Sequence, residues 1–147
     1  MLYSSTVWDS CSRANIEKIY KLQKRAARVI LEADMYESSN PLFKQLNWLT
    51  ISDEIEIRKC CLIYERIYGL TPDYIDDIPV KNTDLHLRTT RHSNVNLVCP
   101  RYNRESEGGR TFQVSGTKLW NTIPTNIKKK SSYNSFYKAI RSYYYNR

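Results

Sequence analysis

The stretch Arg110-Thr-Phe-Gln-Val-Ser-Gly-Thr-Lys-Leu-Trp-Asn-Thr-Ile-Pro-Thr-Asn-Ile127 decides the fold more than any other part of this chain. Its apolar residues first alternate with polar ones, which predicts a short strand with Phe112 and Val114 on one face. Gly116 then predicts a turn into a short helix that carries a leucine and a tryptophan. Pro124 is expected to end that helix, because a proline inside a helix removes a backbone hydrogen bond.

A second run with alternating apolar positions, Val95 to Cys99, precedes this stretch. A loop that contains Gly108 and Gly109 joins the two runs, so the sequence predicts a small antiparallel β-hairpin. Beyond the hairpin, Ser132 is the expected N-cap of a C-terminal helix.

The first half of the chain predicts helices. Apolar residues recur at helical spacing over about residues 13–33, and an Asn-Pro pair at residues 40–41 is a favourable helix start. Ser52 is the expected N-cap of a longer helix, which Gly69 should end and which Pro72 prevents from continuing. The expected fold class is therefore mostly α with a small β-hairpin.

A chain of 147 residues with 41% apolar and 26% charged residues has the composition of an ordinary globular protein. We expect a single domain over residues 1–147 with a sizeable buried core. The sequence has no apolar run near the roughly 20 residues that span a bilayer, and its amino terminus lacks the pattern of a signal peptide. We therefore expect an intracellular protein of the nucleus or cytoplasm that is not secreted and has no membrane partner.

Charge is distributed unevenly along the chain. Residues 1–78 carry 10 Lys and Arg against 12 Asp and Glu, whereas residues 79–147 carry 13 against 3, a net charge of +10. The first part is expected to be helical and near neutral, and the second to be a basic arm followed by the hairpin and the last helix. So basic a half attracts polyanions, of which nucleic acid is the commonest inside cells. An acidic protein partner, or solubility alone, is the alternative.

We expect no metal site and no cofactor. The four cysteines are either adjacent or far apart, so no C-x-x-C pair is present to start a zinc site, and buried free thiols are expected. His86, His92 and Cys99 are spaced as metal ligands could be, but the stretch offers no fourth ligand.

Tyr74-Ile75-Asp76-Asp77 matches the Y-x-D-D motif with which reverse transcriptases bind magnesium. In that motif, adjacent carboxylates hold metal ions that bridge the attacking hydroxyl and the triphosphate. The motif requires the tip of a β-hairpin and a third carboxylate, but here it follows a helix end and a Thr-Pro pair that is typical of another helical turn. We interpret the match as a coincidence and expect no catalytic residues, so the chain on its own is not expected to be an enzyme.

Further segments occur in a recognisable order. They are Ser5-Thr-Val-Trp8, Ile19-Tyr-Lys-Leu-Gln-Lys-Arg-Ala-Ala-Arg28, Leu42-Phe-Lys-Gln-Leu-Asn-Trp-Leu49, Tyr68-Gly-Leu-Thr-Pro-Asp-Tyr74, Thr90-Arg91 and Pro100-Arg101. Together with the stretch quoted first, they resemble the carboxyl-terminal tail of reverse transcriptases from jockey-like non-LTR (LINE-type) retrotransposons. The resemblance implies a helical, thumb-like tail of an RNA-directed DNA polymerase, and a non-catalytic fragment of a transposable element, because the family's palm and endonuclease lie upstream.

Two functions are the leading hypotheses. The first is binding of template RNA or target DNA through phosphate contacts without sequence preference, with tyrosine rings stacked on unpaired bases. The side chains expected to bind are Arg91, Arg101, Arg104, Arg110, Lys118, Lys128, Lys129, Lys130, Lys138, Arg141, Tyr144 and Tyr145. The second is a protein-interaction domain that docks on an upstream polymerase domain through the apolar residues at positions 2–8. A decayed fragment with no present activity is a further alternative.

Overall fold

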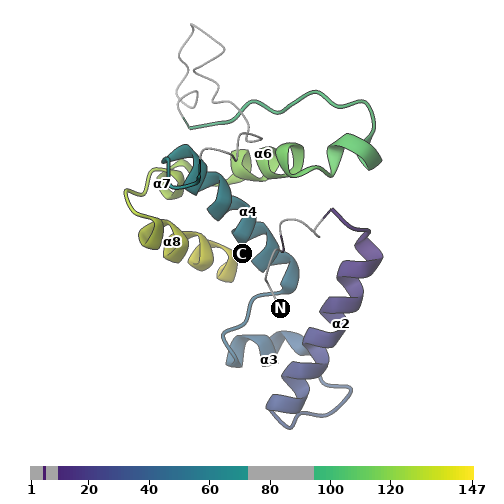
Figure 1. Ribbon diagram of the computed structural model, residues 1–147. Coiled ribbons are helices and arrows are strands. Elements are labelled where there is room, and N and C mark those ends of the chain that lie inside the picture. The colour runs from purple at the N-terminus through teal and green to yellow at the C-terminus, as the bar shows by residue number, and fades with distance from the viewer. Residues whose placement is uncertain (1–4, 6–9, 73–94) are drawn as a thin grey trace, which may run out of the picture. The chain divides into compact units, whose positions relative to one another are not determined.

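The computed structural model describes residues 5, 10–72 and 95–147 (Figure 1), apart from the side chains of residues 106 and 107. This part of the chain is mostly helical, as predicted. The α-helices are α2 (Arg13–Ile30), α3 (Ser39–Gln45), α4 (Ile51–Ile67), α6 (Phe112–Thr122), α7 (Thr125–Lys128) and α8 (Tyr133–Tyr145), and η1 (Glu105–Gly109) is a single π-helical turn. The chain forms two compact units, Met1–Ile55 and Glu56–Arg147, with the boundary inside α4. Within the described ranges, no helix is long and apolar enough to cross a bilayer.

The core of the first unit lies between α2 and α3. Ala27 of α2 is buried against Leu42 and Phe43 of α3. The Phe43 ring also meets Tyr20 and Trp48, with ring centroids 6.1 and 6.2 Å away. Edge-to-face and tilted arrangements of this kind are the favoured geometries for aromatic pairs. The helical spacing read over residues 13–33 thus marks the side of α2 that packs on α3.

The N-terminus of α4 is capped by side chains, because its first amides have no partner within the helix. Thr50 Oγ1 accepts a hydrogen bond from the Asp53 amide at 3.2 Å and donates to Asp53 Oδ2 at 2.6 Å. Gln23 Oε1 of α2 accepts from the Ile51 amide at 2.9 Å. The N-cap is therefore Thr50, and the predicted cap at Ser52 is wrong by two residues.

Three helices end in the same hydrogen-bonded turn. The residue after the last turn is left-handed in each, with φ of 51° at Glu32, 53° at Asn47 and 68° at Gly69. The next amide donates to the carbonyl five residues earlier, at 2.7 to 3.0 Å, in all three turns. This is the Schellman arrangement, which satisfies carbonyls that the helix leaves without partners. The prediction that Gly69 ends α4 is confirmed.

The core of the second unit is aromatic. Tyr64 of α4, Trp120 of α6 and Phe136 of α8 are all buried. The rings of Tyr64 and Phe136 stack with centroids 4.3 Å apart, and Trp120 lies 5.9 Å from Phe136. The Trp120 Nε1 donates to the Val95 carbonyl at 2.8 Å, so its one polar atom is satisfied inside the core.

The predicted β-hairpin is wrong. Phe112 begins α6, and Val95 to Cys99 forms no strand. Val114, Thr117 and Trp120 are buried on α6 at intervals of three residues, which is a helical period. The two alternating apolar residues that suggested a strand fit either period, because the run is too short to separate a repeat of 2 from one of 3.6.

A side chain of α6 takes the place that a neighbouring strand was expected to fill. Asn121 Oδ1 accepts from the Leu97 amide at 3.0 Å, and Asn121 Nδ2 donates to the Leu97 carbonyl at 2.9 Å. An amide side chain carries the same donor and acceptor as a peptide group, so it can satisfy both backbone groups of one extended residue.

Gly116 lies inside α6 and not in the predicted turn. A Cβ atom at this position would be 3.1 Å from Cδ1 of Ile63 on α4. The absence of a side chain therefore allows α6 to approach α4 closely, which is the second common use of glycine besides a positive φ.

Candidate nucleic-acid interface

The predicted binding residues fall into three groups, and Arg91 lies outside the described residues. The first group surrounds η1 and α6, the second is at the end of α7, and the third is on α8. In chain order the groups are Arg101, Arg104, Arg110 and Lys118; then Lys128, Lys129 and Lys130; then Lys138, Arg141, Tyr144 and Tyr145.

Two of these side chains are buried, namely Lys128 and Tyr144. The Lys128 Nζ donates to Asn96 Oδ1 at 3.0 Å and to the Asn121 carbonyl at 3.4 Å, and burial lowers the pKa of Lys128. The Tyr144 hydroxyl donates to Glu56 Oε2 at 2.9 Å. Both side chains hold the second unit together, so neither belongs to a binding surface.

Lys129 and Lys130, which we call the lysine turn, are exposed in the link between α7 and α8. Two hydroxyls of α4 hold the main chain there. The Tyr64 hydroxyl donates to the Lys130 carbonyl at 2.7 Å, and the Tyr68 hydroxyl donates to the Lys128 carbonyl at 3.2 Å. Tyr68 itself stacks on Tyr64 with centroids 4.3 Å apart and is 45% exposed. Two cations are thus presented from a fixed backbone beside an accessible ring.

Lys138, Arg141 and Tyr145 share one side of α8, which we call its outer face, because residues three, four and seven apart align on a helix. Arg141 Nη1 donates to the Tyr137 hydroxyl at 3.2 Å. The Tyr137 ring is nearly parallel to that of Tyr133, with centroids 6.4 Å apart. A row of rings and a guanidinium therefore runs along α8 beside the outer face.

The group around η1 and α6 is less available to phosphate. Lys118 Nζ donates to the Tyr102 hydroxyl at 2.5 Å and lies 3.9 Å from Glu105 Oε2. The hydrogen bond from Lys118 to Tyr102 is the main cause that raises the pKa of Lys118. Arg101, Arg104 and Arg110 are exposed at the surface of this segment.

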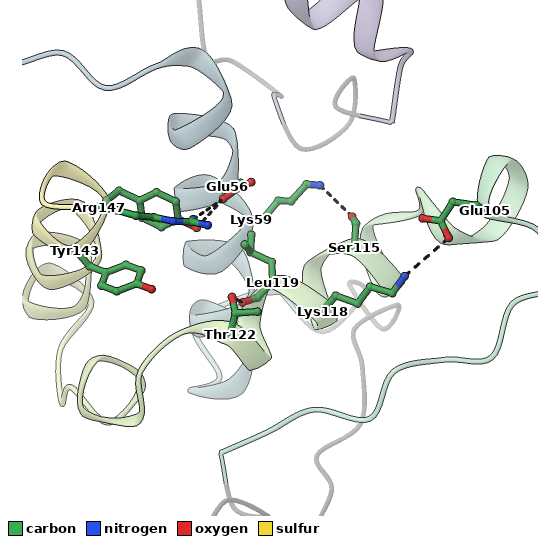
Figure 2. Close-up of a pocket in the computed structure, with 11 residues that line it drawn as sticks. Glu56, Lys59, Glu105, Ser115, Lys118, Leu119, Thr122, Tyr143 and Arg147 are labelled. Carbon is green, nitrogen blue, oxygen red and sulfur yellow. Dashed lines mark hydrogen bonds and ion pairs between the residues drawn. The ribbon is translucent and has the colours of Figure 1, made fainter. Parts of the chain in front are cut away.

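A pocket of about 430 Å³ lies among α4, α6 and α8 (Figure 2). Lys59 Nζ donates to Ser115 Oγ at 3.0 Å on one side of it. On another side, the Glu56 Oε2 that accepts from Tyr144 also lies 3.9 Å from Arg147 Nη1. Burial and the Glu56 charge raise the pKa of Tyr144, so its hydroxyl keeps the proton that it donates.

The sequence did not single out this pocket or Tyr68 as part of a site. The pocket is lined by residues of α4, η1, α6 and α8, and its paired residues Glu56 and Arg147 are far apart in the chain. In the sequence, Tyr68 contributes only to the segment Tyr68 to Tyr74 that carries part of the family resemblance. A tyrosine just before the glycine that ends a helix lies at the edge of the core, and this position is the signal that could have identified it.

No metal site is found among the residues that the structure describes, since no group of three His, Cys, Asp or Glu side chains could hold an ion. Cys99 is exposed. His86, His92 and the Tyr74 to Asp77 motif lie outside the described residues.

Comparisons with known proteins give no relative from which a function could be transferred. No protein-family model, curated protein or solved structure matches this chain. A functional assignment therefore depends on the contacts above and on the sequence resemblance.

Proposed function

We propose that this chain binds unpaired nucleic acid through the lysine turn and the outer face of α8, without catalysing a reaction. One observation carries the proposal: exposed cations alternate with tyrosine rings on a rigid frame within a half-chain of net charge +10. Lysine and arginine side chains pair with phosphates, and rings stack on bases that have no Watson–Crick partner.

The contacts that support the proposal favour single strands without sequence preference. Tyr68 and Tyr145 are 45% and 44% exposed, and an accessible ring can stack on any base at roughly 1 to 3 kcal/mol per base. Neither cations nor rings read base edges, so RNA and DNA should both bind. The resemblance to retrotransposon reverse transcriptases supports a role in holding template RNA or target DNA for a polymerase domain.

The test is binding of a fluorescent single-stranded oligonucleotide measured at several salt concentrations. Affinity should fall steeply with salt, and a Lys129→Ala, Lys130→Ala variant should reduce the logarithmic salt slope by about 1.4, since each single-strand phosphate contact contributes about 0.7. Lys18→Ala, Lys21→Ala is the matched control, because these α2 lysines are also exposed but belong to the first unit.

A second control comes from the same lysine run. Lys128→Met removes one charge where the lysine-turn variant removes two, but the Lys128 side chain is buried on Asn96, so affinity should stay within about twofold of the parent. Equal losses from the α2 variant and the lysine-turn variant would reject the proposed surface. Affinity that does not change with salt would reject nucleic-acid binding altogether and would fit a decayed fragment.

Docking on a polymerase body is a second candidate function. The apolar residues at positions 2–8 lie outside the described residues. Val29, Met35 and Tyr36 in the first unit are 77%, 73% and 90% exposed, and exposed apolar side chains can take part in a protein contact. We expect Val29→Lys, Met35→Lys to weaken binding to a separately expressed polymerase domain of the family that the chain resembles, measured by calorimetry. Oligonucleotide binding should not change. Undiminished binding by the variant would exclude this surface.

A further inference from the structure

We infer that the pocket among α4, α6 and α8 binds one nucleoside monophosphate, either free or as the 5′-phosphorylated end of a strand. The strand-end form rests on the proposed function, whereas the free nucleotide does not. About 430 Å³ is within the range of sites that enclose small ligands. The pocket is distinct from the lysine turn and from the outer face of α8, because none of their residues lines it.

The phosphate would lie at the Lys59 and Ser115 side of the pocket. Lys59 is only 6% exposed, so little water screens its charge and an anion beside it is attracted more strongly than at an open surface. Ser115 Oγ accepts a hydrogen bond from Lys59 Nζ at 3.0 Å. Its own hydroxyl hydrogen is therefore directed elsewhere and can be donated to a phosphate oxygen.

The charges of the lining limit how much negative charge the ligand can carry. Lys59, Lys118 and Arg147 face two carboxylates, Glu56 and Glu105, which leaves a net charge of +1. Each carboxylate lies 3.9 Å from a cation, which offsets part of its charge. A monophosphate fits this balance, whereas a triphosphate would bring further negative charges close to the two carboxylates.

The ring of the nucleotide would lie toward the apolar part of the lining. Figure 2 shows Tyr143 of α8 directed toward Leu119 and Thr122 of α6 across the pocket. A planar base can pack on the tyrosine ring and the leucine side chain. The Thr122 hydroxyl, which donates to the Leu119 carbonyl at 2.7 Å, keeps its oxygen available as an acceptor for a base amino group.

The experiment compares four probes on the full chain by calorimetry: AMP, ATP, inorganic phosphate, and an oligonucleotide with or without a 5′-phosphate. We expect AMP to bind more tightly than ATP or inorganic phosphate, and the 5′-phosphate to strengthen oligonucleotide binding by about tenfold, the effect of one charge-assisted hydrogen bond. Ser115→Ala and Lys59→Met should each abolish the 5′-phosphate preference and weaken AMP binding by a similar factor. Thermal unfolding checks that both variants fold. If Lys59→Met does not fold, Ser115→Ala still tests the inference.

Lys129→Ala, Lys130→Ala separates this inference from the proposed function, because it should lower oligonucleotide affinity while the 5′-phosphate preference persists. A parent chain that binds AMP but no oligonucleotide would support the pocket and reject the nucleic-acid surface. Equal binding of 5′-phosphate and 5′-hydroxyl strands together with no measurable AMP binding would overturn the pocket. A preference that survives in Ser115→Ala, or phosphate binding as tight as AMP, would overturn it as well.

Discussion

At the scale of single residues, three helix ends place different amino acids in the same left-handed conformation. Glu32, Asn47 and Gly69 all have φ between 51° and 68°. This conformation costs a residue with a Cβ atom about 1 to 2 kcal/mol of free energy. The cost is close to zero for glycine and intermediate for asparagine. The sequence revealed only the glycine, because glutamate gives no local signal for a left-handed turn.

Exchanging residues between these positions should therefore change stability in opposite directions. Glu32→Gly should raise the free energy of unfolding by about 1 kcal/mol, and Gly69→Ala should lower it by a similar amount. A Cβ at Gly69 would meet nothing within 4 Å, so the effect there is purely one of backbone conformation. Urea unfolding followed by circular dichroism measures both changes, with Asn47→Gly as a smaller intermediate case. A stability loss in Glu32→Gly would contradict this account.

At the scale of helices, propensity and capping signals predicted the positions of helices along the chain better than they predicted which residues pack between helices. The long helical period over residues 13–33 and the stop at Gly69 were sufficient to place α2 and the end of α4. The hairpin prediction was wrong because tertiary contacts, and not the local apolar pattern, decide which residues of α6 are buried. Thr117, for example, is fully buried although it is polar, and its hydroxyl donates to the Gln113 carbonyl at 2.5 Å. Likewise, nothing local distinguishes buried Lys128 from its exposed neighbours, since that difference arises from the contact with Asn96.

The close approach of α6 to α4 at Gly116 makes this position sensitive to size. Gly116→Ala should be nearly neutral, because the gain in helix propensity of about 1 kcal/mol offsets the contact with Ile63 at 3.1 Å. Gly116→Val should lower the free energy of unfolding by about 1 to 3 kcal/mol through overpacking. Chemical unfolding measures both changes. Equal stability of the valine variant and the parent would exclude close packing here.

At the scale of the whole molecule, charge and packing divide the chain at different places. The sequence changes from near neutral to basic at about residue 78, whereas the boundary between the two compact units follows Ile55 in the chain. The larger part of α4 therefore belongs with the basic half and supplies its Tyr64 and Tyr68. Charge counts along a chain report which segments attract polyanions but not which segments pack together, so this division could not be predicted from composition. The expectation of a single domain stays a prediction.

Several protonated groups are buried or half-buried in the second unit, so this unit should be sensitive to alkaline pH. Burial, followed by the effect of Cys61, raises the pKa of Tyr133 from 10.0 to about 12, and burial raises the pKa of Cys60 and Tyr144. Each of these three groups retains in the folded state a proton that it releases in the unfolded state, so their stabilisation is complete below about pH 9 and is lost as the pH rises toward 12. The lowered pKa of Lys128 acts in the opposite direction.

Urea unfolding between pH 8 and pH 11 tests this dependence. Fluorescence of Trp120 should report a falling midpoint for the second unit, while Trp48 in the first unit serves as the internal control, each measured in a variant whose other tryptophans are replaced by phenylalanine. Tyr133→Phe should flatten the pH dependence. A midpoint that rises with pH, or a Tyr133→Phe variant with the parent's slope, would contradict the assigned pKa direction.

The hydrogen bonds from Tyr64 and Tyr68 end on main-chain carbonyls of the link between α7 and α8. Every amino acid has a carbonyl, so these two hydrogen bonds do not depend on which side chains occupy positions 129 and 130. Substitutions other than proline at these positions should therefore leave both hydrogen bonds in place. The strength of the surface charge is thus a property that can be tuned separately from the architecture that carries it.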